Sequence, residues 1–264
     1  MQLCISNLSW HKKELPKAIK LFKKKKINFL EYSTYNLNNQ FSRNNNIKDI
    51  KNFWQNNSIY LYSMQSILFK KKNAFIFGNK KQQNIFYDEI TKKIKLANFF
   101  NTKVIVFGSP KNKKMFGKNN KECHKLMIKF LKKVSLLCKK YKIVFCLEAN
   151  PKIYQTEYLT ETNQALNIIK KVNSRFIRLN LDLGTIISNK ENLEFIVKNH
   201  LKLVGHVQIS SPYLTNLRKY KKQIKKLIYC LKKYNYRKII SIEMLAQKRN
   251  NIEDLNKILN IIEL

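Results

Sequence analysis

The feature that most constrains the fold is a regular alternation of short apolar segments with longer amphipathic ones. Eight segments have the pattern of a strand, and each is followed by one with the pattern of a helix. Eight strand and helix pairs close a parallel barrel, so we expect an α/β fold with a single (β/α)8 barrel. The expected strands are Gln2 to Ser6, Asn28 to Ser33, Ser58 to Gln65, Lys103 to Gly108, the apolar part of Lys142 to Pro151, Phe176 to Asp182, Leu203 to Ser210 and Lys238 to Glu243.

The segments between these strands predict amphipathic helices, because their apolar residues recur with helical spacing. The expected helices are Leu15 to Lys26, Ile47 to Asn56, Gln82 to Phe100, Asn120 to Tyr141, Thr160 to Val172, Asn192 to Asn199, Leu217 to Tyr234 and Ile252 to Ile262.

A doubly wound open sheet is the competing fold, because the same alternation would serve it. No GxGxxG or Walker loop follows any strand, so the usual ligand-binding signatures of the open sheet are missing. The barrel is therefore the favoured prediction. Five glycines and four prolines leave no room for a long flexible linker, so residues 1–264 are expected to form one domain.

The net charge of +37, from 53 Lys and Arg against 16 Asp and Glu, would ordinarily indicate a polyanionic partner. The lysines are spread along the whole chain, however, and accompany many Asn, Ile, Phe and Tyr residues, which share A/T-rich codons. We attribute the charge to genome composition and expect solvated outer helix faces. Non-specific, salt-sensitive adhesion to nucleic acid would follow, but no specific nucleic acid partner is expected.

The sequence contains no stretch of about 18 apolar residues, and its N-terminus lacks the order of a signal peptide. Its five cysteines are scattered without a CxxC pair, which is typical of reduced thiols and argues against a structural zinc site. We therefore expect a cytoplasmic protein that is not associated with a membrane.

Polar residues recur where the expected strands end. In (β/α)8 enzymes the working groups lie at the C-terminal ends of the strands, and seven residues occupy such ends here. Because residues two apart in a strand share a face, His206 lies on the same face as Gln208. The strand-end residues are Glu31, Gln65, Ser109, Glu148, Asp182, Gln208 and Glu243.

Three carboxylates and an amide that converge at one barrel end would repel one another, and a divalent cation would resolve the conflict. Oxygen ligands suit Mn2+ or Mg2+ best, with Co2+ or Zn2+ as alternatives. For any single carboxylate the alternative is a strand-end cap or a surface ion pair. Four polar ends on four successive strands make that alternative less favoured for the group Glu148, Asp182, Gln208 and Glu243.

Seven strings in order along the chain carry a family resemblance: MQLCISNLSW, YSMQSILF, VIVFGSPKN, CLEANPKIY, LDLGT, GHVQISSPYL and SIEM. With these strings the chain resembles the sugar phosphate isomerase/epimerase family, which has the xylose isomerase-like TIM barrel. The resemblance implies a metal held by Glu148, Asp182, Gln208 and Glu243. Gln208 fills a place that many relatives give to histidine and that hydroxypyruvate isomerase-like members give to glutamine.

The resemblance also implies a reaction: isomerisation or epimerisation of a sugar or sugar phosphate through an enediolate. Glu148 and Glu243 would transfer the proton as general base and general acid. Expected substrate contacts are Glu31, Gln65, Ser109, Lys111 and His206, of which Lys111 would be the phosphate partner and His206 could instead support the ligands. Relatives are often dimers or tetramers, so a homo-oligomer is also implied.

The sequence departs from the ketohexose 3-epimerases of this family at three positions. Thr185 and Leu214 replace a histidine and an arginine of those enzymes, and Tyr154 replaces an acidic residue, so their substrate specificity does not carry over. Two further functions stay open. Apurinic endonucleases share the barrel but need a histidine-rich trinuclear zinc site, and this chain has four histidines. A non-catalytic barrel is the other alternative.

Overall fold

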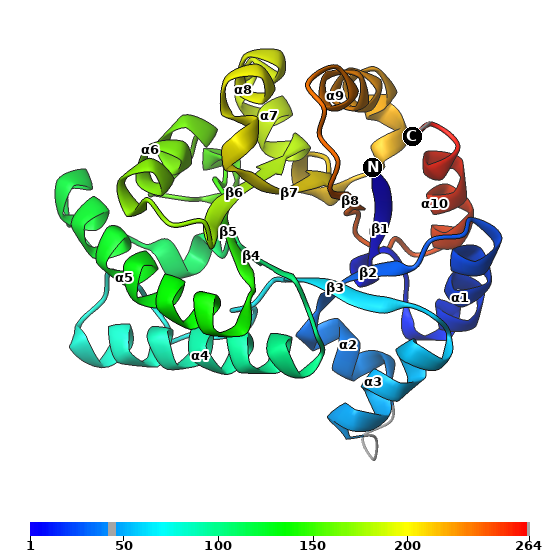
Figure 1. Cartoon of the computed structure of the whole chain (residues 1–264), viewed down its shortest axis with the longest axis horizontal. Helices are drawn as coiled ribbons and strands as arrows, with labels where there is room; N and C mark the ends of the chain where they lie inside the picture. Colours follow the sequence, from blue (N-terminus) through cyan, green and yellow to red (C-terminus); the bar gives the residue numbers. More distant parts are fainter. Residues whose placement is uncertain (42–45, 263–264) are drawn as a thin grey trace. The chain divides into compact units, whose positions relative to one another are not determined.

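The computed structural model describes residues 1–41 and 46–262, and its eight parallel strands form a closed barrel in chain order (Figure 1). The predicted (β/α)8 barrel is therefore confirmed. Every expected strand is present, and its ends lie within one or two residues of the expected ones. The strands are β1 Gln2–Ser6, β2 Phe29–Ser33, β3 Tyr60–Gln65, β4 Val104–Phe107, β5 Val144–Leu147, β6 Ile177–Asp182, β7 Val204–Ile209 and β8 Ile239–Ile242.

The eight expected helices are also present, together with two short ones that the sequence pattern did not predict. The helices are α1 Leu15–Lys24, α2 Thr34–Gln40, α3 Ile47–Asn56, α4 Lys80–Phe99, α5 Asn120–Tyr141, α6 Thr162–Val172, α7 Leu183–Asn189, α8 Leu193–His200, α9 Lys221–Lys233 and α10 Asn251–Leu259. The unpredicted α2 and α7 are seven residues long and directly follow β2 and β6, so no polar loop marks where they begin.

Local sequence fixes where three of the longer helices begin. At each N-terminus an asparagine side chain accepts a hydrogen bond from the backbone N–H three residues later. The side chain of that later residue in turn accepts a hydrogen bond from the asparagine backbone N–H. These capping boxes are Asn46 with Asp49 at α3, Asn79 with Gln82 at α4, and Asn119 with Glu122 at α5.

The strand interiors are covered on both faces, as their continuous apolar sequence predicts. All residues of β4, β7 and β8 are buried. The parallel register of β8 pairs Cys4 with Ser241 on one side and Gln208 with Ser241 on the other. Polar side chains of β7 and β8 are thus brought to one level of the barrel.

The chain divides into two compact units, and each is described by itself. The first comprises Met1–Ser63, Asp182–Leu201 and His206–Leu264, and the second comprises Met64–Leu181 and Lys202–Gly205. Within the first unit α1 packs against α10 and α8 against α9, and within the second α5 lies between α4 and α6. None of the described helices is both long and apolar enough to cross a membrane.

Candidate active site

Glu148 directly follows β5, in the second unit, and two amide side chains hold its carboxylate. Asn150 Nδ2 donates to Oε1 at 2.6 Å, and Asn180 Nδ2 donates to Oε2 at 2.8 Å. The Glu148 backbone N–H continues the β4 and β5 pairing by donating to Phe107 O at 3.0 Å. The strand therefore fixes the backbone of Glu148, and the two amides fix the orientation of its oxygens.

Gly108 makes room for this carboxylate. A Cβ atom at position 108 would lie 2.7 Å from Glu148 Oε1 and 3.1 Å from Asn150 Nδ2, closer than packed atoms approach. Only glycine leaves the Glu148 side chain where the two amides hold it.

Lys113 contacts Glu148 and Asn150 from the end of the 3-10 helix η3 Pro110–Lys113. Its side chain is fully buried, and its ammonium donates to Asn150 Oδ1 at 2.9 Å and to Glu148 O at 3.1 Å. Burial lowers the pKa of Lys113 to about 7, although the charge of Glu148 acts to raise it. Sequence analysis missed this residue because one lysine among so many gives no signal.

Three residues of the second unit were predicted as substrate contacts, and they differ in how far they are exposed. Gln65 ends β3 and is 2 % exposed, and Ser109 is half-buried with a left-handed backbone at φ 49°. Lys111, the predicted phosphate partner, is exposed to solvent. Their roles as substrate contacts remain predictions.

Asp182, in the first unit, ends β6 and caps the N-terminus of α7. Its Oδ2 accepts from the Thr185 backbone N–H at 2.7 Å and from Thr185 Oγ1 at 3.0 Å, while Ser210 Oγ donates to Oδ1. Burial raises the pKa of Asp182, and the hydrogen bonds from Ser210 and Thr185 offset this only in part. A Cβ on Gly184 would lie 3.1 Å from Oδ2 and 2.8 Å from Ser210 Oγ, so a glycine makes room here as well.

Glu31 is the centre of a buried polar cluster in the first unit. Its Oε1 accepts from Gln208 Nε2 at 2.9 Å and from Ser241 Oγ at 2.8 Å. Its Oε2 lies 2.8 Å from His206 Nε2 and accepts from Ser63 Oγ at 2.8 Å. Burial acts to raise the pKa of Glu31, but the hydrogen bonds from His206, Gln208 and Ser241 and the His206 charge lower it below its usual value.

This cluster bears on the predicted roles of three residues. Glu31 has no exposed surface and both of its oxygens are hydrogen-bonded, which is the environment of a group that positions its neighbours. Because the Gln208 amide directs its nitrogen to Glu31, its oxygen is directed elsewhere. The assignments of Glu31 and His206 as substrate contacts remain predictions, and the observed contacts suit the supporting role considered for His206.

Glu243 directly follows β8 and is half-buried. Its backbone N–H donates to Ile209 O at 2.9 Å, which extends the pairing of β7 with β8 by one step. The backbone of Glu243 is thus held at the strand end where the sequence predicted it.

The donor chemistry of the four predicted ligands fits a hard cation, since it consists of carboxylate and amide oxygens. Asp182 is a half-buried carboxylate whose partners among the described residues are Ser210 and Thr185, neither of which carries a positive charge. Within residues 1–41 and 46–262, no three His, Cys, Asp or Glu side chains are grouped so that they could hold a metal ion. Metal binding at this set is therefore a proposal that rests on donor chemistry.

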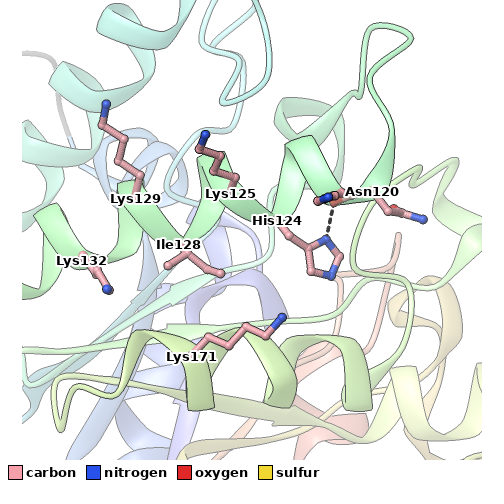
Figure 2. A pocket seen from close by; sticks show the side chains of 8 residues that line it. Asn120, His124, Lys125, Ile128, Lys129, Lys132 and Lys171 are labelled. Carbon is pink, nitrogen blue, oxygen red and sulfur yellow. Dashed lines mark hydrogen bonds between the residues drawn. The ribbon is translucent and has the colours of Figure 1, made fainter.

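A surface pocket of about 700 Å³ lies elsewhere in the second unit, between α5 and α6 (Figure 2). Lys171 comes from α6, and the other labelled residues, including His124 and three lysines, come from α5. None of the predicted site residues lines it. The pocket is a basic outer helix face of the kind that the composition predicts.

Comparison with known proteins identifies the family. The family model for the xylose isomerase-like TIM barrel matches residues 25–262, and the chain belongs to this family. The resemblance that the strand-end motifs indicated is thereby confirmed. No curated protein sequence matches the chain.

Solved structures with the same fold have low sequence identity. The 3-keto-D-glucoside 4-epimerase from E. coli is similar at 14 % identity and a TM-score of 0.77, covering 98 % of this chain and 99 % of that one. The IOLI protein with a bound zinc atom is similar at 16 % and 0.72, covering 99 % and 96 %. The family 2 AP endonuclease from Brucella melitensis is similar at 15 % and 0.75, covering 100 % of both chains.

Proposed function

We propose that the protein is a divalent-metal-dependent isomerase or epimerase of a sugar or sugar phosphate. The observation that carries the proposal is the occurrence of Glu148, Asp182, Gln208 and Glu243 at the carboxyl ends of the four successive strands β5 to β8. Active sites of (β/α)8 enzymes lie at these ends. The family membership and the epimerase among the similar structures support the same class of reaction.

The four residues would hold a cation, with Mn2+ or Mg2+ preferred and Co2+ or Zn2+ as alternatives. When bound, the cation would supply Lewis-acid polarisation of a substrate carbonyl. The zinc atom bound in the similar IOLI structure supports a divalent metal in a protein of this fold. Asp182 and Gln208 would serve as ligands only.

Glu148 and Glu243 would move the proton. One carboxylate would remove a proton from the carbon beside the carbonyl, and the other would return a proton to the opposite face or to the next carbon. Return to the opposite face inverts the carbon, whereas return to the next carbon interconverts an aldose and a ketose. The hydrogen bonds from Asn150 and Asn180 would hold the Glu148 carboxylate in one orientation during the transfer.

Solvent deuterium exchange tests this proposal. The protein is incubated with Mn2+ and a panel of sugars and sugar phosphates in D2O, and deuterium in C–H bonds is measured by NMR. We expect incorporation into one substrate class, and a loss of about 10²-fold or more in Glu148→Gln and in Glu243→Gln. Glu253→Gln, which changes an exposed carboxylate paired with Lys257, is the matched control and should exchange at the parent rate. No exchange with any sugar would contradict the proposal.

Cleavage of abasic DNA is the competing activity, and the net charge and the similar AP endonuclease are the observations that favour it. The positions of the histidines argue against this nuclease activity. His11, His124 and His200 lie outside the strands, and His206 alone lies on one. Metal-dependent cleavage that is lost in the same two variants would replace the isomerase with a nuclease.

A further inference from the structure

Lys113 differs from every other cationic residue that the structure describes. It is the only Lys or Arg among them that is buried, with no exposed surface, whereas the others keep contact with solvent. A buried ammonium is costly unless specific partners satisfy it. Genome composition explains lysines on outer helix faces but not one at this position, so the partners of Lys113 indicate what it does.

Both hydrogen-bond partners of Lys113 belong to the strand end that carries Glu148. The ammonium donates to Glu148 O at 3.1 Å and to Asn150 Oδ1 at 2.9 Å. The ring of Phe107, the last residue of β4, lies 5.9 Å from the ammonium and forms part of its apolar surroundings. Lys113 therefore connects the loop after β4 to the end of β5.

The chemistry of these contacts fixes the Asn150 amide in one of its two orientations. The ammonium form of lysine can only donate, so Asn150 turns its oxygen toward the Lys113 ammonium. Its nitrogen then faces Glu148 and donates to Oε1 at 2.6 Å. With the opposite orientation, the Asn150 oxygen would face the Glu148 carboxylate and the two acceptors would repel.

We propose that Lys113 is a positioning residue for Glu148, which acts by holding the Asn150 amide so that its nitrogen binds the Glu148 carboxylate. Lys113 acts on the Glu148 side chain through Asn150, whereas the Glu148 backbone is already held by the hydrogen bond from its N–H to Phe107 O. The hydrogen bond from Asn180 to Oε2 then completes the arrangement from the other side. The effect on metal binding rests on the function proposed above for Glu148, whereas the effect on the Asn150 amide does not.

Lys113→Met tests the proposal, because methionine retains much of the apolar volume and removes the donors. We expect the Kd for Mn2+, measured by isothermal titration, to rise by about 10- to 100-fold, the usual effect of losing a residue that orients a ligand. Lys114→Met removes the same charge from the exposed neighbouring lysine and should leave the Kd at the parent value. A folded Lys113→Met protein that binds Mn2+ like the parent would overturn the proposal.

A double-mutant cycle separates positioning from a general structural effect. If Lys113 acts through Asn150, then Lys113→Met should change the Kd by less than about 2-fold in an Asn150→Ala background. Equal losses in both backgrounds would overturn the proposed route. Should Lys113→Met fail to fold, Lys113→Gln tests the same route, because the glutamine amide retains a donor for Asn150. The Lys113→Gln protein should then bind Mn2+ more tightly than the Asn150→Ala protein.

The side-chain NMR signals of Asn150 give a readout that needs no metal. In the parent the Nδ2 proton that binds Glu148 Oε1 should resonate away from the solvent-like value, and in Lys113→Met it should move toward that value. Unchanged Asn150 signals would overturn the positioning role. A parent protein that binds no Mn2+ but shows the NMR change would instead contradict the proposed function alone.

Discussion

Two glycines determine where the carboxylates of Glu148 and Asp182 can lie. Gly108 lies against Glu148, and Gly184 lies against Asp182 and Ser210. The chain has only five glycines, and two of them lie beside predicted metal ligands. Each carboxylate is thus set both by the donors that bind it and by the absence of a side chain next to it.

Gly108→Ala should impair the site more than the fold. The new Cβ would lie 2.7 Å from Glu148 Oε1, so the carboxylate must move, and we expect the affinity for Mn2+ to fall by about tenfold or more. Gly117→Ala is the control. Its Cβ meets no atom within 4 Å, but φ is +76°, so it should cost about 1 kcal/mol of stability and leave Mn2+ binding unchanged. Titration calorimetry and urea unfolding of both variants check the two effects, and weaker Mn2+ binding in Gly117→Ala alone would contradict them.

Glu31→Gln should show a pH-dependent loss of stability. The folded-state pKa of Glu31 is lowered from 4.5, so the ionised carboxylate stabilises the fold fully above pH 4.5, and this stability is lost as the pH falls through the folded pKa. At pH 7 we expect the variant to be less stable by about 2 kcal/mol, the usual value for hydrogen bonds to a charged group. Urea unfolding at pH 7 and at several values below 4.5 measures the difference, which should shrink toward low pH. A difference that does not change with pH would show that the charge of Glu31 is not what stabilises the cluster.

Strands and long helices are the elements that the sequence predicts well. The continuously apolar strands and the amphipathic helices were found within one or two residues at most boundaries, because two-sided burial leaves a clear pattern. Helix α7 was missed because it begins at Leu183, directly after the last residue of β6, without an intervening loop. The expected helix from Leu217 to Tyr234 begins instead as a 3-10 helix over Leu217–Tyr220.

Contacts between elements could not be predicted from the same patterns. The strand-end positions of Glu148, Asp182, Gln208 and Glu243 follow from period-two spacing, but the amides and hydroxyls that hold them do not. Asn150 stands two residues after Glu148, which was a weak local signal. Lys113 reaches the backbone carbonyl of Glu148 across 35 residues of chain, and Ser63 reaches the carboxylate of Glu31 across 32. Contacts of that kind appear only once the strands are paired.

The capping box of α5 should contribute to stability as a local element. Asn119→Ala removes the acceptor for the Glu122 backbone N–H, which lies 2.9 Å away, and should cost about 1 kcal/mol. Asn119→Ser retains an acceptor of similar reach and should cost only a few tenths of that. Urea unfolding at 25 °C compares the two, and equal losses in both variants would contradict the capping role.

At the scale of the whole molecule, the charge of +37 acts as a diffuse field. Binding of a labelled single-stranded oligonucleotide should weaken steeply with added salt, as for contacts made to phosphates. Removing positive charge from any one helix face should then weaken binding to a similar extent. The pocket between α5 and α6 and the outer face of α9 provide matched faces for this comparison.

The pocket variant carries Lys125→Glu, Lys129→Glu and Lys171→Glu. The matched variant carries Lys222→Glu, Lys225→Glu and Lys226→Glu on α9, whose lysines are equally exposed. Both change the net charge by the same amount, so we expect fluorescence anisotropy to give equal losses of affinity. A much larger loss in the pocket variant would contradict the diffuse field and would make the pocket a dedicated polyanion site.

The central proposal is that Glu148, Asp182, Gln208 and Glu243 bind one divalent metal ion. Crystals grown with Mn2+ and measured at its anomalous edge test it most directly, because the ion and its ligands are located together. We expect one strong anomalous peak contacted by Glu148, Asp182, Gln208 and Glu243. A peak held by other residues, or none with Mn2+ in excess, would contradict the claim.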